Sequence, residues 1–198
     1  MKLLSIALLC CTLCLVSCSS DAGSGEYDEQ ELVALRQEKD AQFRDSDESP
    51  IPAAKRSSFK GLVYFAPNAE YAVSAQFKES SRADTITMQT SKDDLRKAVR
   101  VGTFAFTVNG KNCKLAAYTF VGGQDENSYF VPFTDLTSGH ETYYAGRYLD
   151  VPVQEDEDYV LDFNVAYNPY CAYNENYSCP LVPRENNLSV AIRAGEKK

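Results

Sequence analysis

The charged residues that could do chemistry in this 198-residue chain gather in its last third. They are Arg147, Asp150, Asp162 and Glu185. Two carboxylates at strand ends, with an arginine nearby, can act as the general acid and base that glycoside hydrolysis requires. The same residue types also form buried arginine–carboxylate networks, in which the planar guanidinium pins a loop to a sheet. We favour the buried network, and the hydrolytic site is the alternative.

Tyrosine and asparagine side chains form a second candidate set in the same region. Tyrosine rings can stack on a sugar or another polar, uncharged ligand, while side-chain amides fix its orientation through hydrogen bonds. Alternatively, the tyrosines fill strand faces and the asparagines cap the backbone of their own loop. The residues concerned are Tyr148, Tyr167, Tyr173, Asn164, Asn168 and Asn186.

Two cysteines, Cys171 and Cys179, stand close together in the same region. In an exported protein such a pair predicts a disulfide. A thiolate nucleophile at Cys171 is the alternative, although the neighbouring sequence supplies no evident base. A zinc site that also uses Cys113 and His140 lacks any paired ligand spacing, so we predict no metal.

Most of these residues lie in or beside one long irregular segment, residues 167–187. The segment contains three prolines and no plausible helix or strand. Loops of this length inside a domain are usually functional or disordered. Eight of the chain's 13 tyrosines fall between residues 143 and 177, so we expect an ordered, functional loop.

One helix is predicted before the strands that must hold this loop. Asp28 suits the N-cap of a helix, and the apolar stripe that follows ends near Arg44. Pro50 and Pro52 then stop any continuation, because they lack the N–H donors that a helix uses.

From Phe59 onward apolar residues alternate, which is typical of strands. Asn109-Gly110 predicts a tight hairpin turn, since both positions suit the left-handed backbone region. The predicted strands are 59–65, 71–78, 84–90, 99–108, 113–121, 129–133, 141–150, 159–166 and 188–194, with a short helical turn over 91–98. The pattern is mainly β and predicts an antiparallel β-barrel or sandwich with one N-terminal helix.

The start of the chain has the features of a bacterial lipoprotein signal. Residues 3–16 form an apolar stretch that is too short to span a bilayer and fits a signal peptide. Leu15, Val16 and Ser17 then precede Cys18, a pattern of branched apolar, small or apolar, and small residues that resembles the bacterial lipobox. The Cys18 thiol can accept diacylglycerol, and two or more acyl chains anchor a protein stably. We predict a signal peptide over 1–17, lipid attachment at Cys18, a flexible spacer over 18–27 and one β-rich domain over 28–198. The membrane, inner or outer, stays open.

Three segments resemble a known family. Residues 142–150 (TYYAGRYLD), 162–173 (DFNVAYNPYCAY) and the C-P-x-x-P-x-E-N…A-G-E pattern over 179–196 are similar to the signature of the bacterial family catalogued as domain of unknown function 1684. The resemblance covers roughly residues 30–196 and brings no established activity, substrate or cofactor. It implies that the long loop is the family's signature, and His140 lies outside that signature. The charged members of the signature are Arg147, Asp150, Asp162 and Glu185.

The composition excludes several function classes. A net charge of −8 argues against nucleic-acid binding, because no basic excess is available to neutralise phosphates. No glycine-rich phosphate loop follows a predicted strand, and we predict no cofactor. We expect first a lipid-anchored cell-envelope protein that binds a small polar ligand such as a glycan through the Tyr/Asn-rich loop. A hydrolytic enzyme that uses Asp150, Asp162 and Arg147, or Cys171, is second, and an envelope scaffold is third.

Overall fold

The computed structural model describes residues 27–123 and 127–198. The predicted signal peptide, the lipid attachment at Cys18 and nearly all of the predicted spacer lie outside the described residues. Within the described ranges, no helix has the length and apolar character needed to cross a membrane.

The predicted N-terminal helix is present as α1, Glu29–Asp45. The side chain of Asp28 caps it by accepting hydrogen bonds from two backbone N–H groups of the first turn, at 2.8 and 3.1 Å. The helix buries Leu32 and Phe43 against the rest of the domain. A second, four-residue helix, α2 (Ala53–Arg56), follows. The expectation of one N-terminal helix is therefore only partly right.

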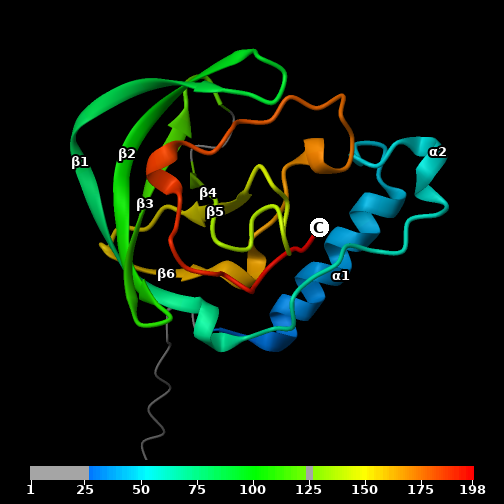
Figure 1. The fold of residues 1–198 in the computed structure, drawn as a ribbon, viewed down its shortest axis with the longest axis horizontal. Helices are drawn as coiled ribbons and strands as arrows, with labels where there is room; N and C mark the ends of the chain where they lie inside the picture. The colour runs from blue at the N-terminus through cyan, green and yellow to red at the C-terminus, as the bar shows by residue number, and fades with distance from the viewer. Residues whose placement is uncertain (1–26, 124–126) are drawn as a thin grey trace, which may run out of the picture.

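Six strands of the described chain form one sheet, and every pairing in it is antiparallel. The sheet order is β5-β4-β3-β2-β1-β6 (Figure 1). The bounds are β1 (Ala72–Gln89), β2 (Leu95–Val108), β3 (Lys111–Phe120), β4 (Ser128–Phe133), β5 (Arg147–Pro152) and β6 (Asp158–Asp162). The prediction of a mainly antiparallel β fold is confirmed.

The two edge strands of this sheet are consecutive in the chain, and this forces the sheet to curl. Residues 153–157 join β5 to β6, and a connection of that length spans at most about 20 Å. The edges of a flat six-stranded sheet would lie about 24 Å apart. The sheet therefore bends into a nearly closed, barrel-like shape, and its curvature is visible in Figure 1.

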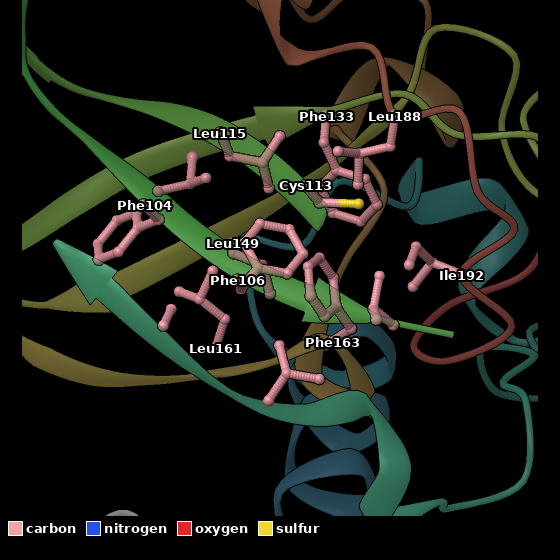
Figure 2. Packing of buried hydrophobic residues seen from close by; sticks show 14 of the residues in the cluster. Phe104, Phe106, Cys113, Leu115, Phe133, Leu149, Leu161, Phe163, Leu188 and Ile192 are labelled. Atoms are coloured by element: carbon pink, nitrogen blue, oxygen red, sulfur yellow. The ribbon is translucent and has the colours of Figure 1, made fainter. Parts of the chain in front are cut away.

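Apolar side chains fill the inside of the curled sheet. Phe104, Leu115, Phe133 and Leu161 have no exposed surface. Figure 2 shows these rings and aliphatic chains meeting in one cluster between the strands. This packing of the described residues leaves no room for a ligand inside the curled sheet. The cleft described below lies on the outer face of the sheet.

Several strand boundaries differ from the prediction. Asn109 and Gly110 form the expected turn between β2 and β3, with φ of 51° and 70°. β1 combines two predicted strands, 71–78 and 84–90, through an irregularity in its pairing with β2. β2 already begins at residue 95, so the helical turn predicted over 91–98 is wrong there. β5 covers only the end of the predicted strand 141–150, and β6 ends before the predicted residue 166.

Two predicted strands do not join the sheet. Residues 59–65 contribute a single bridge, between Tyr64 and Glu196. Residues 188–194 bury every second side chain as a strand does: Leu188, Val190, Ile192 and Ala194. Among the described residues, their backbone nevertheless pairs only with the backbone of the segment after β4: Leu188 N–H donates to Thr134 O at 2.8 Å, and Leu136 N–H donates to Val190 O at 3.0 Å. Alternating burial requires an extended chain, but it does not require a neighbouring strand.

Candidate functional site

A cleft of about 600 Å³ lies between the outer face of the sheet and the long loop. Strand alternation builds its floor: because Arg147 and Leu149 point into the core, Tyr148 and Asp150 of β5 point outward. Seven aromatic side chains line the cleft: Tyr118, Phe120, Phe130, Tyr148, Tyr167, Tyr170 and Tyr177. The first four come from strands and the other three from the loop.

Asn186 and Glu185 fix one end of the loop to the sheet. Asn186 is fully buried, and its side-chain amide accepts from Ala116 N–H at 2.8 Å and donates to Ala116 O and Pro132 O at 2.9 and 2.7 Å. Glu185 accepts a hydrogen bond from the Tyr118 hydroxyl at 2.5 Å. Both side chains therefore position the loop, and neither lines the cleft.

The middle of the loop is held against the turn that follows β1. Ser91 N–H donates to Cys179 O at 2.9 Å. The Tyr148 hydroxyl donates to Pro180 O. Burial raises the pKa of Tyr148, so this hydroxyl stays a neutral donor. The loop wall of the cleft is thus fixed at several points.

Asp150 and Tyr167 form a polar pair in the cleft. The Tyr167 hydroxyl donates to Asp150 Oδ2 at 2.6 Å. Burial, together with the charge of Asp150, raises the pKa of Tyr167 well above its usual value. Lys39 Nζ lies 4.6 Å from the centre of the Tyr167 ring and 2.7 Å from Glu196 Oε1. Asp150 is the exposed member of this set and can be reached by a ligand hydroxyl.

Arg147 lies outside the cleft, in the core beneath the C-terminal segment. Only 1% of its surface is exposed. Its guanidinium donates to Ile192 O at 2.8 Å, to Glu196 O at 3.3 Å and to Ala194 O, and it lies 3.3 Å from the Asp135 carboxylate. Arg147 therefore binds carbonyls that a neighbouring strand would otherwise take. It is buried beside a carboxylate, but that carboxylate is Asp135 and not one of the predicted ones, and the segment that it holds is the C-terminal one and not the long loop.

Asp162 caps the backbone at the end of β6. Its carboxylate accepts from the N–H and the side-chain amide of Asn164 at 2.8 and 2.7 Å, and so caps the short 3₁₀ helix that follows the strand. The buried Asn164 amide in turn pairs with both backbone groups of Asn68, at 2.8 and 3.0 Å. Arg147, Asp150 and Asp162 thus do not meet in one pocket, and the predicted acid and base pair is not assembled.

Asn168 and Tyr173 belong to a buried cluster around Glu196. Asn168 N–H donates to Glu196 Oε2 at 2.8 Å, and its side-chain amide donates to Lys197 O at 2.8 Å. The Tyr173 hydroxyl also donates to Glu196. Since Lys39 neutralises Glu196 from the cleft side, this cluster joins the loop, the C-terminal segment and α1.

Cys171 and Cys179, the predicted disulfide pair, are free thiols that lie side by side in the structure. Cys171 N–H donates to Cys179 Sγ at 3.2 Å. Cys113 lies in the apolar core. Across residues 27–123 and 127–198, no three His, Cys, Asp or Glu side chains are close enough together to hold a metal ion.

Most of the lining residues were not among the predicted site residues, and Lys39, Arg96, Tyr170 and Tyr177 are four of those that were missed. The two tyrosines pack edge to face with ring centres 5.2 Å apart, and the tyrosine density of the loop was a signal for them. Lys39 comes from α1 and Arg96 from β2. No sequence pattern links these distant residues to the loop. The assembled cleft offers aromatic faces, a carboxylate and hydroxyls, which suits binding.

Comparisons with known proteins find one matching family and a similar solved structure, both without an assigned function. The family described as protein of unknown function (DUF1684) matches residues 57–197. Among solved structures, the solution NMR structure of an uncharacterized protein from Haloarcula marismortui is 37% identical, with a TM-score of 0.68. The match covers 86% of this chain and 94% of that one. No curated protein matches the chain.

Proposed function

The chain belongs to the DUF1684 family, and we propose that it binds a small polar, uncharged ligand such as a glycan in the cleft beneath its long loop. The cleft itself carries the proposal. Its volume of about 600 Å³ falls within the range of about 300–1,000 Å³ that is usual for small-molecule sites. A sugar has apolar C–H faces that pack on aromatic rings, and seven rings line this cleft.

The charges around the cleft favour an uncharged ligand. Lys39 is already paired with Glu196 at 2.7 Å. Among the lining residues, Arg96 supplies one positive charge and Asp150 supplies one negative charge. A strongly charged ligand therefore meets no excess of opposite charge, whereas a neutral polar ligand meets both donors and acceptors.

Asp150 is proposed to orient the ligand. An ionised carboxylate offers about four lone-pair positions, so it can accept from ligand hydroxyls as well as from Tyr167. The raised pKa of Tyr167 keeps its hydroxyl protonated, and that hydroxyl fixes one oxygen of Asp150 at 2.6 Å. The rings of Tyr170 and Tyr177 would then cover the ligand from the loop side.

Saturation-transfer NMR with a panel of neutral oligosaccharides, including maltotriose and diacetylchitobiose, tests this proposal. We expect transfer to at least one saccharide from the native protein and none from Asp150→Ala. Glu155→Ala is the matched control, because Glu155 is an exposed acidic residue in the connection between β5 and β6. The proposal fails if no saccharide receives signal, or if the two variants behave alike.

The proposal includes attachment of the domain to a bacterial membrane, inner or outer, through a lipid on Cys18. The apolar stretch over residues 3–16 and the Leu15-Val16-Ser17 run before Cys18 support it. In a bacterial host, a labelled fatty acid should be incorporated into the native chain and into Cys113→Ala. Incorporation should be lost in Cys18→Ser, and label retained in that variant would contradict the anchor.

A further inference from the structure

Two thiols lie in contact where the long loop meets the turn after β1. Cys171 belongs to the short 3₁₀ helix Tyr170–Ala172, and Cys179 lines the cleft. Cys171 N–H donates to Cys179 Sγ at 3.2 Å, which places the Cys179 sulfur against the backbone of Cys171. The ligand-binding proposal makes no use of this contact.

The two sulfur atoms have different surroundings. Cys171 is half-buried, and its Sγ lies 3.8 Å from the Tyr143 hydroxyl. Cys179 is buried, with 7% of its surface exposed. Hydrogen bonds from Cys179, and then from Tyr143 and Ser91, lower the pKa of Cys171 to about 6 against the opposing effect of burial. The hydrogen bond to Cys171, followed by burial, raises the pKa of Cys179.

Different parts of the fold hold the two cysteines. The backbone of Cys179 pairs with Ser91, with N–H to Oγ at 3.1 Å and O to N–H at 2.9 Å. The segment of Cys171 is held through Tyr170, whose ring packs edge-on against Phe43 of α1 with centres 6.0 Å apart. Because both anchors are independent of the sulfur contact, the reduced pair stays aligned for reaction.

We propose that Cys171 and Cys179 form a thiol–disulfide exchange site for small disulfides, with Cys171 as the attacking sulfur and Cys179 as the resolving sulfur. The Cys171 thiolate attacks one sulfur of a disulfide RSSR, a mixed disulfide forms, and RS⁻ leaves. Cys179 then loses its proton and attacks Cys171 Sγ. The Cys171–Cys179 bond forms and the second RS⁻ leaves. The protein thiols lose two electrons, and the small disulfide is reduced to two thiols.

The order of the two steps follows from the burial of the two residues: Cys171 is half-buried, whereas Cys179 is buried, so an incoming disulfide meets Cys171 first. Cys179 is buried, and its nearest reaction partner is Cys171 once that sulfur carries the mixed disulfide. Cys113 takes no part, because it lies in the apolar core, where burial raises its pKa.

The test uses the 198-residue chain, reduced and purified in detergent. Cys171 and Cys179 are the only cysteines left in it. Serine replaces Cys10, Cys11, Cys14 and Cys18, and alanine replaces Cys113. Oxidised glutathione is added at neutral pH and the protein mass is followed. We expect the intact pair to lose two hydrogen atoms without retaining glutathione. Cys179→Ser should accumulate a mixed disulfide at Cys171, and Cys171→Ser should react at least about tenfold more slowly.

Tyr143→Phe tests the assigned geometry without removing a sulfur. Loss of the hydroxyl should slow the reaction of Cys171 by about threefold at pH 6.5. Tyr27→Phe, which removes a hydroxyl beside the first turn of α1, should react at the native rate. Circular dichroism establishes that each variant is folded. Equal rates for native protein and Tyr143→Phe would contradict the assignment of Cys171 as the attacking thiolate.

Two further results would overturn the proposal. One is a fast mixed disulfide on Cys179 in Cys171→Ser, which would reverse the roles of the two sulfurs. The other is a folded pair that neither oxidises with glutathione disulfide nor, once oxidised, is reduced by glutathione, which would make it a purely structural pair. Saccharide binding is not measured in this experiment, so its failure leaves the proposed function untouched.

Discussion

Arg147 donates hydrogen bonds to backbone carbonyls of the C-terminal segment, which in a sheet would be bound by a neighbouring strand. Replacing Arg147 should therefore destabilise the domain strongly. Arg147→Met leaves the buried Asp135 carboxylate without its partner at 3.3 Å and removes donors to three carbonyls. Breaking a buried ion pair from one side costs about 3–5 kcal/mol. Each unsatisfied carbonyl adds to this loss, so we expect a decrease of about 5 kcal/mol in the free energy of unfolding.

A loss of that size could unfold the domain outright, so a milder variant accompanies it. Arg147→Lys keeps a charge opposite Asp135 but lacks the planar fork that reaches several carbonyls at once. We expect it to cost about 2 kcal/mol. Arg193→Ala is the matched control, because Arg193 lies in the same segment and pairs with Glu141 at 2.9 Å with 58% of its side chain exposed. An exposed pair of this kind contributes little to the free energy of unfolding, because water and salt screen its charges.

The assay is urea denaturation followed by circular dichroism, since the chain has no Trp to report unfolding by fluorescence. Amide hydrogen exchange of residues 188–196 should also accelerate in Arg147→Lys and stay unchanged in Arg193→Ala. The reasoning is refuted if Arg147→Lys is as stable as the native protein, or if the two variants lose equal stability.

Three further predictions concern the anchors of the loop and of the C-terminal segment. Asn186→Ala removes three buried hydrogen bonds and should cost about 2–4 kcal/mol in urea denaturation, whereas Asn187→Ala, beside it, removes one exposed bond and should cost under about 1 kcal/mol. Gly195→Ala should lower the free energy of unfolding more than Gly110→Ala does. The backbone strain is similar at the two positions, with φ angles of 74° and 70°, but of the two only Gly195 would place a Cβ 2.5 Å from a carbonyl oxygen. Hydrogen bonds from Ser178 and Thr90 lower the pKa of Asp94. The stability that these hydrogen bonds confer is therefore fully present above the pKa of Asp94 in the unfolded chain, and it is lost as pH falls through the pKa of Asp94 in the folded protein. The free energy of unfolding should thus decrease between pH 7 and pH 3, and Asp94→Asn should remove part of that decrease. Equal effects within either matched pair, or an unchanged acid slope in Asp94→Asn, would count against these contacts.

Local patterns were enough to predict most of the sheet. Asp28 caps the helix as expected, Asn109-Gly110 turns the chain between two strands, and alternation locates most of each strand. The segment 188–194 shows the limit of this reasoning. Its alternating side chains are buried as a strand's would be, but Arg147 binds its carbonyls from below. Sequence periodicity reports which side chains are buried, and it does not report what the backbone pairs with.

The site was predictable only where its residues come from the loop and β5. Tyr148, Asp150 and Tyr167 line the cleft, and all three were predicted site residues, Asp150 as a charged member of the segments that resemble the family. Asn164 and Asn186, also candidates, bind backbone groups, as the alternative interpretation of the asparagines held. Arg96 and the other lining residues from remote elements could not be assigned, because the fold alone brings them to the loop.

Calorimetric titration of the native protein with the saccharide that gives the strongest NMR response tests the cleft most directly. Tyr177→Ala removes a ring that lines the cleft, whereas Tyr144→Ala removes one that is 72% exposed and lies outside it. We predict that Tyr177→Ala weakens binding at least tenfold, which is about 1.4 kcal/mol, and that Tyr144→Ala binds as the native protein does. Saturable binding that is unaffected by Tyr177→Ala, or that is weakened equally by both variants, would contradict a ligand site in this cleft.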